Sequence, residues 1–503
     1  MRFIEPGGRA GRPFNAWITR WPLLGGITLA TVLESRGYDA GVYNENISGP
    51  LEANEPAKQD LLSADVIGIG IMTATARRGY ELARWIKQQA PQITVVLGGV
   101  HATMMPNEAA GYADVVVCGE GESVIEAIAS GQITSGIIRA EPLMDLDAIP
   151  TLNHFLMRDF DKLLESFRKR SLYELPMMTS RGCPHACTYC SVTRMFGRAV
   201  RRQSVEKVVR DLEHYAGQGF KQVFFYDDNF ITDREWTGKL LERMKPMRME
   251  FKAQARIDFH WLDRERRSRD LAMLGAMHQG GARLLFVGYE TLDEATAKGW
   301  HKGYRGATSL EARMAEDTRI LHDAGLWVHG MFVLGPQHTA ATAEHIIDFA
   351  KRVRIETLQI SILTPFPGTP LLDEMRPNLF FNDFPNDWDF FDGAHCVYDH
   401  GLLGLEGTQR AILSAHERFY RACALNPRVL RAQLGPRPMT FIDKLRDMWW
   451  GVKASRSIMR NWRSEMVDFD AIIKRRRQER GSHKPILLGS SANGGILEAS
   501  KQE

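Results

Sequence analysis

The stretch TSRGCPHACTYCSVTRMFG, residues 179–197, places Cys183, Cys187 and Cys190 within eight positions in a CxxxCxxC spacing. Thiolates suit iron–sulfur clusters and zinc, and four protein ligands normally close either kind of site. Three thiolates leave one metal position open, where a small molecule can bind. We therefore expect a catalytic iron–sulfur cluster here. The alternatives are three buried structural thiols or an incomplete zinc site.

An aromatic residue, Tyr189, precedes the last cysteine. With it, the motif resembles the signature of the radical S-adenosylmethionine (SAM) superfamily. The resemblance implies that Cys183, Cys187 and Cys190 hold a [4Fe–4S] cluster, whose fourth iron binds the amino and carboxylate groups of SAM. It also implies an external one-electron donor, such as flavodoxin or ferredoxin, and cleavage of SAM to methionine and a 5′-deoxyadenosyl radical. That radical takes hydrogen from an unreactive carbon of a small-molecule substrate.

Length and composition describe a multidomain globular protein. The 503 residues suggest roughly three domains, and the 44% hydrophobic and 25% charged fractions are those of folded proteins. A net charge of +3 argues against a nucleic-acid partner. The longest apolar stretch, residues 23–33, is shorter than the ~20 residues of a membrane span. The start resembles no secretory signal, so we expect a cytoplasmic protein.

Residues 1–140 alternate short apolar runs with helical patterns, which predicts a doubly wound, flavodoxin- or Rossmann-like α/β domain with a parallel sheet. Ligands bind at the carboxyl ends of such strands. Two glycine-rich turns follow strands and should lie there. The domain resembles the cobalamin-binding domain that precedes many radical SAM barrels. The resemblance implies that five turn residues lie near a corrinoid: Gly98, Gly99, His101, Gly119 and Glu120.

That family often carries an Asp-x-His-x-x-Gly motif whose imidazole binds cobalt. The segment Asn44-Glu45-Asn46-Ile47-Ser48-Gly49 has the spacing and the final glycine, but Asn46 stands where the histidine would be. An amide is a poor cobalt ligand compared with imidazole. Two alternatives stay open: cobalamin binds in another ligation state, or the domain keeps the fold without the cofactor.

After a linker over residues 141–175, residues 176–375 show six strand–helix repeats, which predict a partial (β/α)6 barrel with its chemistry at the strand ends. Polar residues follow successive strands: Asp227, Asp228, Gln254, Arg256 and Glu290. The resemblance implies that these residues surround SAM. Asp227 or Asp228 would bind its amino group, Arg256 its carboxylate and Glu290 a ribose hydroxyl. The alternative is that they only solvate the barrel rim.

Residues 376–480 should form a lid and a mainly helical region, with a flexible tail at 481–503. His395, Cys396 and His400 are expected to be packing residues rather than metal ligands. A second helix, with Trp449, Trp450 and Trp462 among basic residues, predicts packing onto the barrel or, as an alternative, peripheral contact with a membrane or acidic partner.

The leading functional hypothesis is a radical SAM enzyme, which is a C-methyltransferase if cobalamin is bound. Without cobalamin, a radical cyclisation, oxidation or rearrangement is expected. A hypothesis of another class is a non-catalytic corrinoid or redox sensor. The pattern identifies neither a catalytic side chain nor the substrate.

Overall fold

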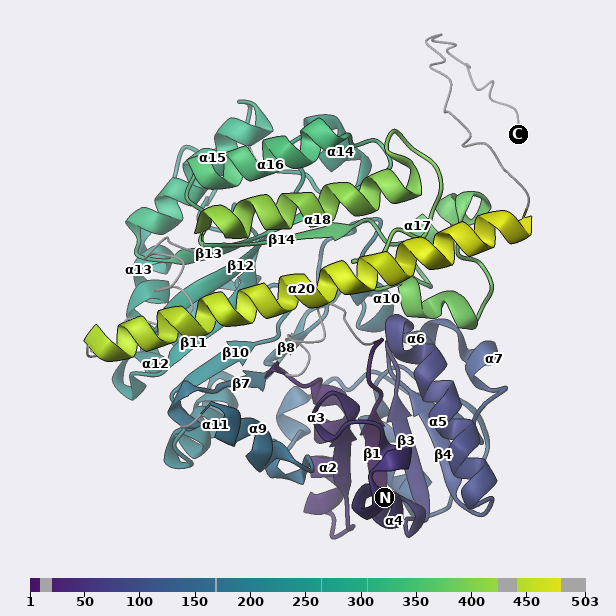
Figure 1. Cartoon of the computed structure of the whole chain (residues 1–503). Helices are drawn as coiled ribbons and strands as arrows, with labels where there is room; N and C mark the ends of the chain where they lie inside the picture. The colour runs from purple at the N-terminus through teal and green to yellow at the C-terminus, as the bar shows by residue number, and fades with distance from the viewer. Residues whose placement is uncertain (10–19, 168–169, 264, 305, 424–440, 481–503) are drawn as a thin grey trace, which may run out of the picture.

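The computed structural model describes residues 1–9, 20–167, 170–263, 265–304, 306–423 and 441–480. These residues form two six-stranded parallel sheets with helices around them, a two-stranded sheet and a helical C-terminal region (Figure 1). The predicted fold class is confirmed. The exact division of the chain at residues 140, 175, 375 and 480 stays a prediction, and the tail at 481–503 lies outside the described residues.

The N-terminal sheet has the strand order β2-β1-β3-β4-β5-β6, and every neighbouring pair is parallel. Its strands are β1 (Arg2–Glu5), β2 (Gly41–Asn44), β3 (Val66–Gly70), β4 (Thr94–Gly98), β5 (Val115–Cys118) and β6 (Gly136–Arg139). The chain leaves β1 for β2 on one side and then continues to β3 on the other. Such a reversal opens a crevice at the carboxyl ends of β1 and β3, where ligands bind in open parallel sheets.

Helices cover this sheet because β1 to β5 bury apolar residues on both faces, whereas the edge strand β6 is mostly exposed. The helices are α2 (Leu24–Ser35), α3 (Glu45–Ser48), α4 (Glu55–Leu62), α5 (Ala76–Gln89), α6 (Val100–Met104), α7 (Pro106–Ala109) and α8 (Ile125–Ala129). In α5 the residues Leu82, Ala83 and Ile86 share the buried face. After the sheet, α9 (Phe160–Ser166) leads to the second domain.

The second sheet has the order β14-β13-β12-β11-β10-β7 and is also parallel throughout. Its strands are β7 (Glu174–Met177), β10 (Gln222–Phe225), β11 (Glu250–Ala255), β12 (Ala282–Glu290), β13 (Trp327–Leu334) and β14 (Thr357–Ile362). A small hairpin-like pair, β8 (Ser180–Arg181) and β9 (Arg201–Arg202), flanks the cysteine loop. Six neighbouring parallel strands are the predicted partial (β/α)6 barrel.

Helices alternate with the barrel strands, in agreement with the predicted strand–helix repeats. They are α10 (Val192–Met195), α11 (Val205–Gly217), α12 (Arg234–Met244), α13 (Leu271–Gln279), α14 (Glu294–Gly299), α15 (Leu310–Asp323), α16 (Ala340–Arg352) and α17 (Pro370–Met375). Ser204 caps α11 by accepting a hydrogen bond from the backbone nitrogen of Lys207. Val208, Val209 and Leu212 form the buried face of this helix.

An N-terminal segment enters the barrel from the other domain. Trp21 packs on the sheet face opposite to the helices, against Phe224 (ring centroids 4.9 Å apart) and Phe286 (6.3 Å). The Tyr226 hydroxyl donates a hydrogen bond to the carbonyl of Trp21 (2.7 Å). The two domains are therefore held together by a shared apolar core.

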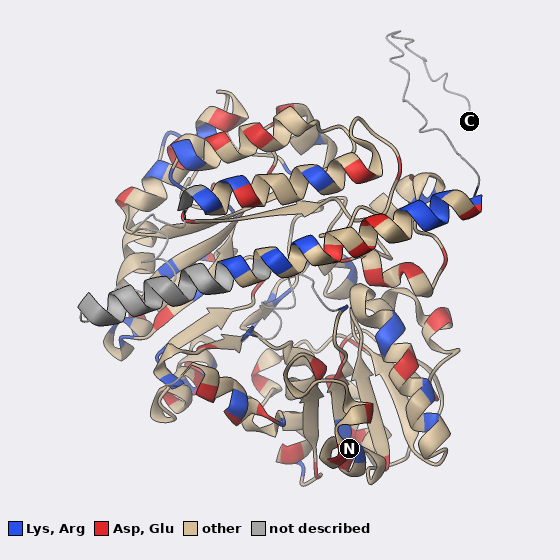
Figure 2. Ribbon diagram, viewed as in Figure 1, with Lys and Arg blue, Asp and Glu red and all other residues tan. Residues whose placement is uncertain are grey.

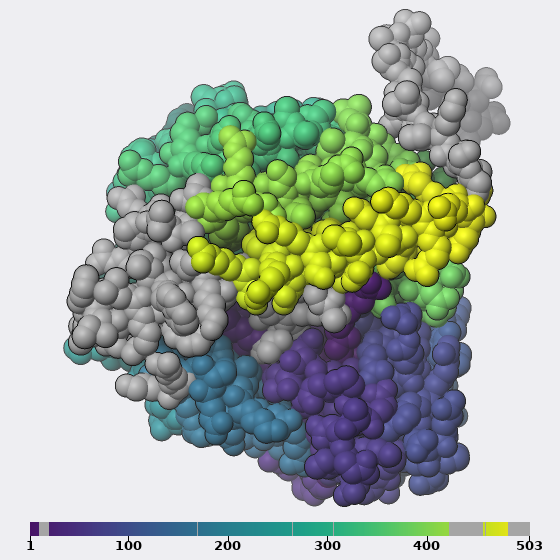
Figure 3. Space-filling view, in the orientation of Figure 1, coloured from purple at the N-terminus to yellow at the C-terminus, as the bar shows by residue number. Residues whose placement is uncertain are grey.

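The C-terminal region packs onto both domains. The 3₁₀ helix η9 (Asn386–Phe390) contacts α5, and the Trp388 indole donates to Glu108 (3.0 Å). The helix α18 (Gly404–Cys423) lies beside α16 and β14, and α20 (Phe441–Arg480) contacts α18 and crosses the barrel surface (Figures 1 and 3). Through these contacts the C-terminal region packs against both the barrel and the N-terminal domain.

Trp462 of α20 is buried against His416 of α18 (ring centroids 4.8 Å apart). This contact supports the packing alternative for that residue, while the side chains of Trp449 and Trp450 lie outside the described part. Acidic and basic residues are interspersed along the described half of α20 (Figure 2). Within the described residues, no helix combines the length and apolarity that a membrane crossing needs.

Candidate active site

The three cysteines of the motif lie on one loop between β8 and α10, and none of them forms a disulfide. The backbone nitrogen of Cys190 donates to the carbonyl of Cys187 (3.2 Å). Gly182 is needed at the entry to the loop, because its φ is +96° and a Cβ would lie 2.4 Å from the carbonyl oxygen of Ala199. The loop brings three free thiols to the carboxyl end of the barrel sheet.

These thiols fit an iron–sulfur cluster. Burial raises the pKa of Cys190 to about 11 and raises that of Cys183 above its usual value, so both stay protonated at neutral pH until a metal displaces the proton. Among the described residues, no three His, Cys, Asp or Glu side chains converge on one metal ion. A [4Fe–4S] cluster needs no such convergence, because each cysteine binds a different iron.

The acidic pair after β10 divides into two roles. Asp227 is buried, and its carboxylate accepts hydrogen bonds from the Thr179 nitrogen (3.1 Å), the Thr179 hydroxyl (2.7 Å) and the Ser180 hydroxyl. It holds the end of β7 against the end of β10. Asp228 receives no hydrogen bond from any described residue, and burial together with Asp227 raises its pKa to about 7. Asp228 is thus the carboxylate left for a ligand.

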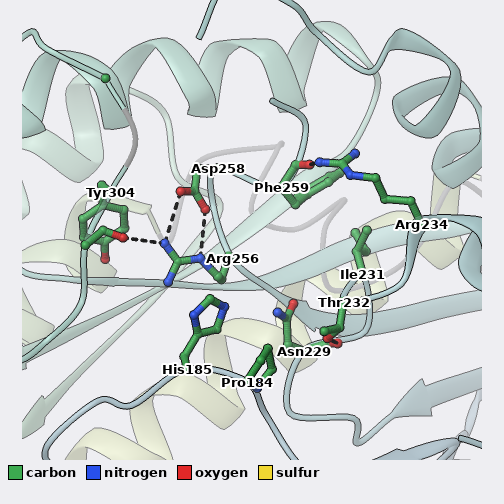
Figure 4. A pocket seen from close by; sticks show the side chains of 12 residues that line it. Pro184, His185, Asn229, Ile231, Thr232, Arg234, Arg256, Asp258, Phe259 and Tyr304 are labelled. Atoms are coloured by element: carbon green, nitrogen blue, oxygen red, sulfur yellow. Dashed lines mark hydrogen bonds and ion pairs between the residues drawn. The ribbon is translucent and has the colours of Figure 1, made fainter. Parts of the chain in front are cut away.

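Arg256 follows β11 and is held in place by its neighbours. Its guanidinium donates to Asp258 through Nε (3.0 Å) and Nη2 (3.1 Å) and to the carbonyl of Gly303 (2.7 Å), and it lies over the Tyr304 ring (Figure 4). Burial lowers the pKa of the Arg256 guanidinium, but the Asp258 carboxylate raises it, and the result is a pKa above the ordinary value. Arg256 therefore stays cationic. Gln254, also predicted as a site residue, lies on β11 outside the pocket around Arg256.

Glu290 ends β12 in a strained conformation. Its φ is +63°, and the register with β13 shifts between Gly288 and Glu290. The Lys302 ammonium donates to its carboxylate. A Cβ at Gly288 would lie 2.4 Å from a Glu290 carboxylate oxygen, so a larger residue would require the ends of the Glu290 and Lys302 side chains to shift. Left-handed backbone in a non-glycine residue persists only where surrounding contacts impose it, and such residues concentrate at functional sites.

Two pockets flank the cysteine loop. The first, of about 620 Å³, is lined by Pro184 and His185 of the loop together with Arg256, Asp258 and Tyr304 (Figure 4). The second, of about 260 Å³, is lined by Tyr189, by residues of the second half of β13 and β14 or just after them, and by Asp392 and Gly393 of the C-terminal segment. The cysteine loop therefore lines both a polar chamber and a smaller, less polar one.

Several residues of these pockets carry no signal in the sequence. Asp258 and Tyr304 line the first pocket beside Arg256, whose guanidinium donates to the Asp258 carboxylate and to the carbonyl of Gly303, the neighbour of Tyr304. Asp392, which follows the barrel in the sequence, lines the second pocket. The short string Arg256-Ile-Asp258 is the one pattern that could have indicated a guanidinium held by its own loop. The His395 Nδ1 atom forms a hydrogen bond with the Asp392 carboxylate (3.0 Å), and the Cys396 thiol donates to the Tyr398 carbonyl (3.3 Å), as expected of packing residues.

A third cavity, of about 530 Å³, lies between the two domains. On one side it is lined by the strand ends of the N-terminal sheet, including Gly70, Gly98, Gly99 and Gly119. On the other side it is lined by residues of the barrel and its cysteine loop: Met177, Met178, Ser191, Val192, Met195, Phe196 and Asp228. The cavity therefore joins the crevice of the first sheet to the loop that carries the cysteines.

The glycines give this cavity a flat floor. A Cβ at Gly98 or Gly70 would have only one atom within 4 Å, a carbonyl oxygen at 3.9 Å or 4.0 Å, so a side chain there would fill open space. Gly99 and Gly119 both have φ of +91°, and a Cβ at Gly99 would lie 2.8 Å from the carbonyl oxygen of Ile71. A flat floor beneath a mostly apolar wall fits the face of a corrin ring.

The second glycine-rich turn links the domains. Glu120 is buried and accepts from Arg181 (2.5 Å) and Arg201 (2.5 Å), and Glu122 accepts from Arg181 (2.6 Å). Arg181 stands two residues before Cys183, so this ion network ties the cavity floor to the cysteine loop. The Glu120 carboxylate therefore binds these two arginines and serves a structural role.

His101, which the resemblance placed near a corrinoid, and the segment Asn44–Gly49 both lie outside this cavity. His101 is completely buried outside the cavity lining, between Thr73 (3.4 Å) and Glu108 (3.2 Å). Asn44 ends the edge strand β2, where its amide accepts from the Asn46 nitrogen (2.8 Å) and caps α3. Neither asparagine lines the cavity.

The segment 44–49 is therefore wrongly matched to the cobalt-binding motif, because it follows the edge strand rather than β1 or β3. Among the described residues between β1 and β2, those that line the cavity are 23–26, 28 and 29, and residues 1–29 contain no histidine. The cavity lining also contains none among the described residues.

Comparison with known proteins identifies both domains. A model of the B12 binding domain matches residues 19–129, and a model of the radical SAM superfamily matches residues 177–350. Bacteriochlorophyllide d C-12(1)-methyltransferase of Chlorobaculum tepidum is 25% identical over 85% of this chain and 88% of its own. An uncharacterized methyltransferase of Pyrococcus horikoshii is 29% identical over 73% of this chain and 80% of its own.

The fold agrees. The radical SAM methyltransferase TsrM from Kitasatospora setae, solved with cobalamin and a [4Fe–4S] cluster, superposes with a TM-score of 0.65 at 16% identity, over 92% of this chain and 99% of its own. The two sheets and the cysteine loop define a two-domain α/β enzyme with a barrel active site. The chain belongs to the radical SAM superfamily and carries a B12-binding domain before its barrel. It is an enzyme whose cofactors are a [4Fe–4S] cluster and SAM.

Proposed function

We propose that this chain is a cobalamin-dependent radical SAM methyltransferase that methylates an unactivated carbon of a small molecule. The observation that carries the proposal is the cavity between the domains, whose floor is the glycine-rich strand ends and whose opposite wall is the cysteine loop. A corrinoid there would lie beside the cluster and the substrate chamber. When bound, SAM and the cluster supply a carbon-centred radical, and cobalamin supplies a methyl group.

Cys183, Cys187 and Cys190 are proposed to hold the cluster. Asp228 has no described donor of its own, so it can accept hydrogen bonds from the ammonium group of SAM. Arg256 is cationic and held rigidly by Asp258, which suits a carboxylate partner. We do not assign Asp227 to SAM, because its carboxylate already accepts hydrogen bonds from Thr179 and Ser180.

Glu290 is proposed to accept from a ribose hydroxyl of SAM. Its strained backbone turns the carboxylate back over Gly288, and Lys302 holds it there. The groups proposed for SAM come from three successive strand ends, and two of them, Arg256 and Glu290, are fixed by neighbouring side chains. Fixed groups orient a ligand without losing side-chain entropy when it binds.

Gly98, Gly99 and Gly119 are proposed to face the corrinoid through backbone alone. Because the described lining has no histidine, cobalt would receive no imidazole from the residues that line this cavity. We assign His101 and Glu120 structural roles beside this site. His101 forms a hydrogen bond with Glu108, and Glu120 accepts hydrogen bonds from Arg181 and Arg201.

Of the relatives named above, only the bacteriochlorophyllide methyltransferase is named for a substrate, so the names indicate methylation but no substrate for this chain. The family as a whole requires a small-molecule substrate and an external one-electron donor. We further place the enzyme in a reducing, cytoplasmic compartment, which is where open iron–sulfur sites and unpaired thiols persist.

Anaerobic reconstitution tests the assignment. The protein should retain about four iron per chain and a stoichiometric corrinoid after desalting, and it should release 5′-deoxyadenosine from SAM with dithionite. Cys187→Ala should lose iron and SAM cleavage but retain corrinoid. Cleavage without retained corrinoid would move the function to a cobalamin-independent radical reaction. A retained cluster without any cleavage would favour a sensor.

A further inference from the structure

The outer side of the cysteine loop reaches the molecular surface. Pro184 and Ala186, which stand between the first two cysteines, are exposed, whereas the cysteines are only partly so. The pocket of about 620 Å³ opens beside Pro184 and His185 (Figure 4). A cluster held by this loop would lie close to solvent on this side of the barrel.

Three exposed cations lie on segments next to this loop. Arg194 lies in α10 directly after the last cysteine, and Arg198 donates a hydrogen bond to the carbonyl of Pro184 (3.0 Å). Lys298 lies near the end of α14, which approaches the loop where the Thr188 nitrogen donates to the carbonyl of Trp300 (3.3 Å). We call Arg194, Arg198 and Lys298 the cationic rim.

The cationic rim keeps its charge uncompensated. Within the described residues, none of its three members forms an ion pair. Nearby cations deeper in the site are paired, Arg256 with Asp258 and Lys302 with Glu290. The exposed Glu294 of α14 is likewise paired, with Arg313 (2.9 Å). The three members of the rim therefore carry unpaired positive charge beside the loop.

We propose that the cationic rim docks an acidic one-electron donor protein of the flavodoxin or ferredoxin class. The inference rests on the proposed cluster, because electron transfer slows steeply with distance and favours docking over the loop that holds the acceptor. In the step, the donor is oxidised by one electron and the cluster is reduced by one, and no bond forms. Charge complementarity would orient the donor and raise its association rate.

The variant Arg194→Glu/Lys298→Glu tests the surface. Arg198 is left unchanged because its guanidinium bonds to the cysteine loop. A matched control, Lys221→Glu/Arg243→Glu, reverses two exposed cations near the amino end of β10 and the carboxyl end of α12, away from the loop. The readout is 5′-deoxyadenosine formation in the reconstituted enzyme, driven in separate arms by fully reduced flavodoxin and by dithionite.

The rim variant should raise the KM for flavodoxin by about tenfold while leaving the dithionite-driven rate unchanged. Added salt should slow the flavodoxin arm of the wild-type enzyme and of the control, and should have little effect on the variant. Equal KM values for variant and wild type would overturn the proposal. So would a wild-type enzyme that dithionite reduces but flavodoxin does not. Failure of both arms would instead contradict the cluster assignment.

Discussion

Asp227 and Asp228 are neighbours in the chain with opposite surroundings, and this contrast predicts opposite mutant phenotypes. Asp227→Ala removes the acceptor of three buried donors and should cost roughly 1–3 kcal/mol of stability and much of the iron content. Asp228→Asn should keep the fold and iron but raise the KM for SAM by about 10- to 100-fold, because a charged hydrogen bond is lost. Thermal unfolding, iron analysis and SAM kinetics separate the two; the reverse pattern would refute these roles.

Glu5 predicts a pH dependence of the apo-protein. Burial at the end of β1 raises its pKa from 4.5 to about 8, while its carboxylate accepts from Asn44 (2.8 Å). The folded state therefore holds this proton more tightly than the unfolded chain. The stabilising contribution is complete below about pH 4.5 and is lost as the pH rises through about 8.

Between pH 6 and 8, Glu5 should lower the free energy of unfolding by about 2–3 kcal/mol. Glu5→Gln keeps an acceptor for Asn44 and should lose this part of the pH dependence. Urea unfolding of wild-type and variant apo-protein at the two pH values measures the difference. Parallel pH dependence in both proteins would count against a buried, neutral Glu5.

At the scale of elements, the turn after β5 and the strand pair β8–β9 are joined by a buried ion network. Glu120→Gln leaves Arg181 and Arg201 short of a carboxylate, and breaking a buried pair costs about 3–5 kcal/mol. The control Glu126→Gln breaks an exposed pair with Arg36 and should cost less than about 1 kcal/mol. Urea unfolding compares them, and equal losses would show that the network does not hold the domains.

At the scale of the whole molecule, the cavity exists only because two domains face each other. Gly98→Leu would project a side chain from the floor into this space and should weaken cobalamin binding more than about tenfold without altering the fold. Gly238→Leu in α12, where a Cβ meets nothing within 4 Å, is the control and should bind normally. Corrinoid retained per chain after reconstitution is the measurement. Normal retention by Gly98→Leu would place the corrinoid elsewhere.

Local patterns predicted much of this molecule correctly. The spacing of Cys183, Cys187 and Cys190 and the alternation of strands and helices in both domains are short-range features. Short-range sterics, hydrogen bonding and the burial of one helix face act on neighbouring residues, so they can be read without knowing the fold.

The Asn44–Gly49 match failed for a physical reason. Spacing showed a strand followed by a turn, but only the strand order places β2 at the edge and β1 and β3 at the crevice. Likewise, nothing in the string Asp227-Asp228 shows that one carboxylate faces Thr179 and the other the cavity.

The sequence alone determined the class of chemistry, the two α/β patterns and the strand ends at which polar residues would gather. Tertiary structure alone decided which of those residues are free to bind a ligand, and it created the cavity from residues as distant as Gly26 and Asp228. The reason is that side-chain occupancy and cavity shape depend on packing between sheets that are far apart in the chain. No local pattern encodes that packing.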